Sequence, residues 1–100
     1  MMTTLAILRK ARALVARKKG WTQHGYGNSA GAVCALGALR KAETGHAYGK
    51  WTCTEGLSYL RRVIGYDVAN WNDSHERTQG QVVAAFDRAI ELAKKEKDKK

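Results

Sequence analysis

The chain has 100 residues, 44% of them hydrophobic, and a formal net charge of +9. This length and composition suit one globular domain and exclude a disordered chain. No apolar run approaches the roughly 18 residues that a membrane span needs, and Arg9, Lys10 and Arg12 interrupt the segment in which a signal peptide would be apolar. We therefore expect a cytoplasmic protein that does not insert into a membrane.

The basic residues are concentrated at the two ends of the chain. Residues 1–19 contain six Lys or Arg and no acid, residues 20–90 contain seven bases and six acids, and residues 91–100 contain five bases and three acids. The body of the chain is nearly neutral, which argues against a fold built as a whole around nucleic acid. An electrostatic contact with a partner is expected at the N-terminal segment.

Residues 4–19 form the first predicted helix. Thr3 or Thr4 can cap its start, and Gly20 can end it. One face of this helix is apolar and carries Ile7, Leu8, Ala11, Leu14 and Val15. The opposite face and the last turn carry the positive charges of Arg9, Lys10, Arg12, Arg17, Lys18 and Lys19. This is the pattern of an amphipathic helix with a basic outer face.

Residues 20–29 contain three glycines and no apolar periodicity, which predicts a loop. Asn28 or Ser29 can then cap a second helix that begins at Ala30. Residues 30–39 carry no charge and are apolar nearly all round. Such a segment is expected to be the buried, central helix of the fold.

Two capping boxes mark the starts of two more helices. The first is Thr52-Cys53-Thr54-Glu55, and Gly65 ends the helix that follows it. The second spans residues 78–81, and its helix continues toward the charged tail of residues 94–100, which is predicted to fray. Residues 67–71 have room for one short helical turn. The apolar positions of the two helices are Leu57, Leu60, Val63, Ile64, Val82, Phe86, Ala89, Ile90 and Ala93.

No stretch alternates apolar and polar residues for long enough to indicate a strand. The sequence therefore predicts an all-α fold, a compact single-domain bundle of four main helices with long connecting loops. The domain is expected to span residues 1–100, with an ordered core from about residue 4 to about residue 95 and a charged C-terminal tail.

Trp71-Asn72-Asp73 stands just ahead of Thr78, the cap of the last helix. In a structural interpretation Trp71 packs against the helix at Gly37, while Asn72 and Asp73 bond backbone amides at the corner. In a functional interpretation the two polar side chains lie at a pocket mouth beside an aromatic wall. The structural interpretation is favoured, because Asn and Asp are common in helix connections for local reasons.

Cys34, His46 and Asp73 occur in the order of a thiol-protease triad, with Gln23 placed like an oxyanion donor. A small-ligand or cysteine-dependent catalytic pocket around them is therefore an alternative. The order carries little information in a chain with so few candidate residues. Cys34 lies in an apolar run, where a reduced, buried thiol behaves as a small hydrophobic group.

Two further sites have weaker support. Zinc would need Cys34 and Cys53 with His24 and His46, but no closely spaced pair pre-organises these ligands, so no metal and no cofactor are expected. The glycine-rich residues 25–31 resemble a phosphate loop ahead of a helix but lack the preceding strand and the following Lys-Ser/Thr. Binding of a small anion there is a minor alternative.

The segments "GWTQHGYG", "AVCALGALRKA" and "VANWNDSHERTQGQVVAAFDRAIELA" resemble a family of small proteins of unknown function from actinobacteria, their phages and other prokaryotic viruses. The likeness spans most of residues 10–93. Members usually carry a longer, more acidic loop after Trp-Thr-Gln, and a tryptophan or polar residue where this chain has Val33. The resemblance implies a compact helical domain and a phage or prophage setting, and it implies no catalytic residue.

These observations favour a non-enzymatic, phage-type accessory protein in the cytoplasm of a bacterial host. It would bind a host or phage protein, or nucleic acid through its phosphates, with the basic face of residues 9–19. A structural homodimer that buries tryptophans is a further alternative. Membrane binding is not expected, because the apolar face of the first helix is needed for the core.

Overall fold

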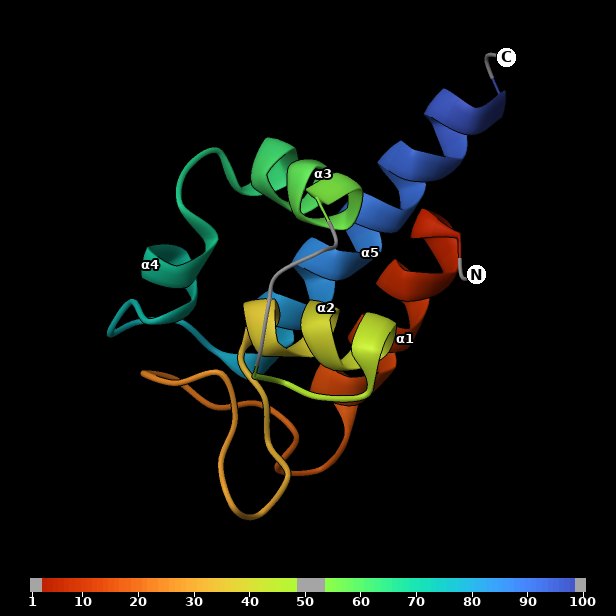
Figure 1. The fold of residues 1–100 in the computed structure, drawn as a ribbon. Coiled ribbons are helices and arrows are strands. Elements are labelled where there is room, and N and C mark those ends of the chain that lie inside the picture. The colour runs from red at the N-terminus through yellow and green to blue at the C-terminus, as the bar shows by residue number, and fades with distance from the viewer. Residues whose placement is uncertain (1–2, 49–53, 99–100) are drawn as a thin grey trace.

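The computed structural model describes residues 3–48 and 54–98. Its five helices are α1 (Thr4–Ala16), α2 (Ala35–Thr44), α3 (Thr54–Ile64), α4 (Val68–Asn72) and α5 (Gln79–Asp98) (Figure 1). The radius of gyration, 12.4 Å, is close to the ~13 Å of a compact domain of this length. The predicted all-α fold is confirmed, since the described residues pair only in isolated bridges and form no strand. None of the helices in this part of the chain is both long and apolar enough to span a membrane.

The helices α1 and α5 form an antiparallel pair. Gln79 at the start of α5 donates from Nε2 to the carbonyl oxygens of Val15 and Arg17 at the end of α1, over 2.7 and 2.8 Å. Midway along the pair, Arg12 forms an ion pair with Asp87 at 2.9 Å. Helix α2 packs against α1, and α3 packs against α5. The core is formed by several helices and not by α2 alone, as the sequence suggests. Its largest fully buried side chains are Phe86 on α5, Leu8 on α1, Leu39 on α2 and Leu60 on α3.

Helix α1 begins where the sequence predicts and ends three residues earlier. Oγ1 of Thr3 caps the helix by accepting a hydrogen bond from the amide of Ala6 over 3.1 Å. The helix stops at Ala16 instead of Lys19, because Arg17 is extended, with ψ of 152°. The chain then turns back sharply, and the amide of Gly20 donates to the carbonyl oxygen of Arg17 over 2.8 Å. Gly20 ends the turn, not the helix.

Helix α2 begins at Ala35, five residues after the predicted start at Ala30. The prediction for residues 30–34 is wrong because a buried extended segment is as apolar as a buried helix, and apolarity alone does not separate them. Gly31 has a φ of +91°, which an α-helix does not accommodate. Val33 instead pairs with Trp21 in an isolated bridge.

The ends of α2 and α3 and the start of α5 agree with the sequence, whereas α5 continues to Asp98, through residues that the sequence predicts to fray. Gly45 and Gly65 end α2 and α3 in the left-handed region, with φ of 89° and 94°. The capping box before α5 is present, since the amide of Gln81 donates to Oγ1 of Thr78 over 3.2 Å and the amide of Thr78 donates to Oε1 of Gln81 over 3.0 Å. The short turn predicted at residues 67–71 is α4.

The capping box predicted before α3 lies partly outside the described residues, which omit Thr52 and Cys53. Within the described part, Glu55 accepts a hydrogen bond from Oγ1 of Thr4 over 2.5 Å. The start of α3 is therefore tied to the start of α1. At its other end α3 is tied to α5, where Arg62 pairs with Glu96 at 2.7 Å.

Candidate functional site

Asn72 is fully buried, and its side chain hydrogen-bonds the loop at Trp21 and Thr22 and the start of α2 at Ala35. Its Oδ1 accepts from Nε1 of Trp21 at 2.8 Å and from the amide of Ala35 at 3.0 Å. Its Nδ2 donates to the carbonyl oxygen of Thr22 at 3.2 Å and to Oδ1 of Asp73 at 3.0 Å. A side-chain amide offers two donors and two acceptor positions, and all are used inside the protein. No capacity is left for a ligand.

Gln23 and Asp73 fasten the loop before α2 to the same corner. Nε2 of Gln23 donates to the carbonyl oxygens of Asn72 and Ser74, over 3.0 and 2.8 Å. Oδ1 of Asp73 accepts from the amide of His24 over 2.8 Å, and its Oδ2 lies 3.9 Å from Nδ1 of the same histidine. Gln23 therefore holds two backbone carbonyls and does not act as an oxyanion donor.

Trp71 is buried, with 6% of its surface exposed. Arg77 covers its ring, with the guanidinium carbon 4.1 Å from the ring centroid, and donates from Nε to the carbonyl oxygen of Trp71 over 2.8 Å. The space beside Gly37, which the indole is expected to fill, is filled by another residue. The atoms closest to Gly37 belong to the Tyr26 backbone, which a Cβ at Gly37 would overlap. The glycine makes room for the loop before α2 and not for the indole.

Cys34 is buried and caps α2. Its Sγ accepts from the amide of Gly37 over 3.3 Å. Burial raises the pKa of the Cys34 thiol above its ordinary value of 9.0, the hydrogen bonds from Gly37 and Leu36 lower it, and the nearby charge of Asp73 raises it further. The thiol therefore stays protonated at neutral pH, the opposite of what a nucleophilic cysteine needs.

The structure brings Cys34 and Asp73 together but not His46. Cys34, Asn72 and Asp73 line a pocket of about 190 Å³ between the loop and α4. His46 lines a different pocket. The order of residues that resembles a thiol-protease triad thus does not become a triad in space. Among the described residues no three His, Cys, Asp or Glu side chains are grouped to hold a metal ion, and Cys53 lies outside them.

Several amides of the glycine-rich loop are bonded within the chain instead of being open to an anion, as the phosphate-loop pattern would need. Oδ1 of Asn28 accepts from the amides of Ala30 and Ala32, over 3.0 and 3.1 Å. At the true start of α2, the amide of Ala35 is taken by Asn72 and that of Gly37 by the Cys34 thiol. The chain's own acceptors therefore use two of the α2 amides that a phosphate would need.

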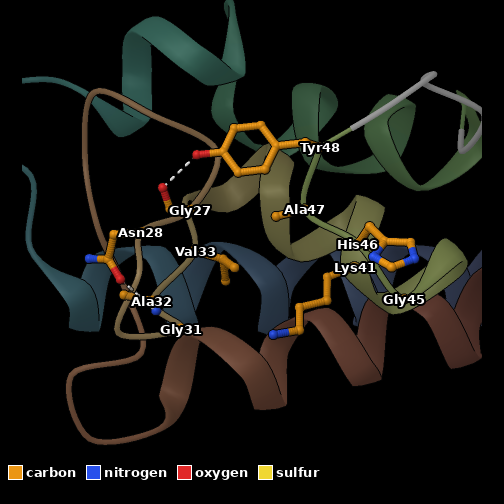
Figure 2. A pocket seen from close by; sticks show the side chains of 10 residues that line it. All are labelled: Gly27, Asn28, Gly31, Ala32, Val33, Lys41, Gly45, His46, Ala47 and Tyr48. Carbon is orange, nitrogen blue, oxygen red and sulfur yellow. Dashed lines mark hydrogen bonds between the residues drawn. The ribbon is translucent and has the colours of Figure 1, made fainter.

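The larger pocket, about 490 Å³, lies between the loop before α2 and the segment after it (Figure 2). Tyr48 and Lys41 lie on opposite sides of it, with Val33 and Ala47 between them. The hydroxyl of Tyr48 donates to the carbonyl oxygen of Gly27 over 2.7 Å, so the ring bridges the mouth. Sequence reasoning missed Lys41 and Tyr48, because only the folded loop brings them together. The pocket is completed by Asn28, Gly31, Ala32, Gly45 and His46.

The basic residues predicted as a contact surface divide into two groups. Arg12 is paired with Asp87, and Arg17 donates to the carbonyl oxygens of Leu14 and Gly31, each over 3.0 Å. The second group, which we call the basic α1 surface, consists of Arg9, Lys10, Lys18 and Lys19. Their side chains are exposed and have no ion-pair partner among the described residues.

A comparison with protein-family models matches residues 1–92 to a family described as "Family of unknown function (DUF6197)". No curated protein and no solved structure matches the chain. The family match includes all of α1 to α4, the corner around Asn72 and most of α5. This chain therefore belongs to DUF6197, a family of unknown function.

Proposed function

We propose that the protein binds nucleic acid through the phosphate backbone, with the basic α1 surface as its contact. The observation that supports this is the exposure of Arg9, Lys10, Lys18 and Lys19 on one helix and the turn that follows it, within a segment that holds no acid. The apolar face of α1 is buried against α2 and α5, so the opposite face is available to a partner. Such a surface gives affinity that depends on salt and little on sequence.

The proposed role is that of a non-enzymatic accessory protein, which acts by occupying a macromolecule in the cytoplasm of a bacterial cell. The motifs around Trp21, Cys34 and Asn72 resemble those of small proteins from actinobacteria and phages, which supports a phage or prophage setting. The tight internal use of Asn72 and the protonated state of Cys34 support a role without catalysis.

The test is binding to a labelled DNA duplex, followed by fluorescence anisotropy as salt is raised from about 50 mM to about 200 mM. Affinity is expected to fall steeply with salt. In Arg9→Gln/Lys10→Gln the slope of log K against log salt should decrease by about 1.8, since each phosphate contact contributes about 0.9. The matched control is Arg61→Gln/Lys95→Gln, which removes the same charge from exposed positions on α3 and α5.

Equal losses in the two double variants would mean that net charge alone attracts the DNA, and the assignment to α1 would be wrong. An unchanged anisotropy at the lowest salt, with the duplex and with a single strand of the same length, would overturn the nucleic-acid proposal. An acidic protein surface would then be the remaining kind of target for the basic α1 surface. A pull-down from host lysate with and without nuclease separates these two kinds of partner.

A further inference from the structure

Tyr48 has an unusual combination of exposure and restraint. Its side chain is 59% exposed, yet its hydroxyl donates to the carbonyl oxygen of Gly27 over 2.7 Å. Its ring stands edge-on to that of Tyr26, with centroids 5.7 Å apart and planes at 83°. The Tyr26 ring is in turn covered by the Arg40 guanidinium, 4.7 Å from its centroid. An exposed ring held in one orientation is the platform that a flat ligand needs, because little conformational freedom is lost on stacking.

The pocket beneath this ring has an apolar middle and one cation. Val33 and Ala47 line it between Tyr48 and Lys41, and the Lys41 side chain extends from α2 toward the loop at Gly31 (Figure 2). Among the described residues no carboxylate lies within ion-pair distance of Lys41. Its charge is therefore available to a ligand. The volume, about 490 Å³, lies within the range of roughly 300–1,000 Å³ that small-molecule sites occupy.

These walls suit a ligand in which a flat ring is joined to an anionic group. A ring stacked on Tyr48 would leave its charged group to pair with the ammonium of Lys41 on the other side. A base inside a duplex cannot offer its face to a side chain, whereas an unpaired base can. The pocket also adjoins α1, because Arg17 donates to the carbonyl oxygen of Gly31 on the pocket rim.

We propose that this pocket binds one unpaired nucleotide, with the base stacked on Tyr48 and the phosphate paired with Lys41. This inference rests on the proposed function when the nucleotide belongs to a strand that also contacts the basic α1 surface. The same chemistry would accept a free nucleotide. The protein would then prefer single strands to duplexes, through a contact that charge alone does not provide.

The test compares two single strands of about 12 nucleotides, an oligothymidine and an abasic strand with the same number of phosphates. Fluorescence anisotropy measures their affinities for the wild-type protein, Tyr48→Ala, Tyr48→Phe and Lys41→Gln. Tyr66→Ala is the matched control, since Tyr66 is another exposed tyrosine, 51% accessible, that does not line the pocket. Titration with adenosine monophosphate, followed by NMR, tests a free nucleotide.

The wild-type protein is expected to bind oligothymidine about 5- to 150-fold more tightly than the abasic strand. Tyr48→Ala should remove this preference, Tyr48→Phe should keep part of it because the ring remains without its bond to Gly27, and Tyr66→Ala should leave it unchanged. Lys41→Gln should weaken binding of both strands and lower the salt slope by about 1. Melting curves of each variant show that the fold is retained.

Equal affinity of the wild-type protein for the two strands would overturn the pocket and leave the proposed function standing. A base preference that survives in Tyr48→Ala would also overturn it. Binding of adenosine monophosphate that depends on Tyr48, with neither strand bound, would support the pocket as a site for free nucleotides and overturn the proposed function alone. Absence of binding to the strands and to the nucleotide would overturn both.

Discussion

At the scale of single residues, the structure depends on one buried amide. Asn72 links Thr22, Ala35 and the Trp21 indole, which lie about 37 to 51 positions away along the chain. A serine or threonine hydroxyl at this position would supply only one of the two donors that the planar amide of Asn72 uses. This explains why a motif that looks like a polar site in the sequence acts as a joint between segments.

Replacement of Asn72 by alanine should be strongly destabilising. The substitution leaves the Trp21 indole N–H and the Ala35 amide without a partner, and each such group costs about 1–3 kcal/mol. We expect a loss of about 3 kcal/mol or more in the free energy of unfolding, measured by urea denaturation. Asn70→Ala, on the exposed side of the same short helix, is the control and should change little. Hydrogen exchange at Val33 should accelerate in the first variant only.

Cys34 should make stability depend on pH in the alkaline range. Burial raises the pKa of its thiol above 9.0 in the folded state, so the folded protein keeps a proton that the unfolded chain has lost. This contribution is fully present below the unfolded pKa and is lost as the pH rises through the folded pKa. We expect Cys53→Ser to lose more stability between about pH 8 and about pH 10 than Cys34→Ser/Cys53→Ser. Parallel urea-denaturation curves for the two proteins would contradict this.

At the scale of the elements, Gly37 in α2 and Gly80 in α5 are helical glycines with opposite surroundings. A Cβ at Gly37 would overlap the Tyr26 carbonyl, whereas at Gly80 on α5 there is no neighbouring atom within 4 Å. Helix propensity favours alanine equally at both positions. The difference between the two sites is therefore entirely a matter of packing between α2 and the loop before it.

The matched substitutions Gly37→Ala and Gly80→Ala should move stability in opposite directions. Gly80→Ala is expected to raise the free energy of unfolding by about 0.5–1 kcal/mol, the usual gain in a helix. Gly37→Ala is expected to lower it by about 1–3 kcal/mol, because the backbone of Tyr26 must move to admit the methyl group. Thermal melting measures both. Stabilisation by Gly37→Ala would show that the loop yields easily.

At the scale of the whole molecule, the sequence predicts the helices well and the loop poorly. The caps at Thr3 and Thr78 and the stops at Gly45 and Gly65 are local signals, and the structure follows them. Residues 30–34 follow no local signal. Ala30 and Gly31 lie in a turn and a bend, and Val33 is held outside the helix by hydrogen bonds with the backbone of residues 20–22, a contact that only the folded chain provides.

The candidate sites show the same division between local and long-range information. The exposed charges of Arg9 and Lys10 follow from helical periodicity alone, and the structure leaves both exposed. The pocket does not follow from it, since Tyr48 bonds Gly27, and Lys41 lines the same pocket, only after the loop has folded back on α2. The separation of Cys34 from His46 is likewise a property of the tertiary structure, which the order of residues does not encode.

The anchoring of the loop at both of its ends has an evolutionary consequence. Gln23 is fixed to the carbonyls of Asn72 and Ser74, and Val33 is fixed to Gly20, so the stretch between these points is fastened independently of its length. We expect insertions or deletions there to leave the helices in place as long as the backbone of Tyr26 keeps its position against Gly37. Relatives that share this scaffold can therefore diversify what they recognise by exchanging a single surface segment.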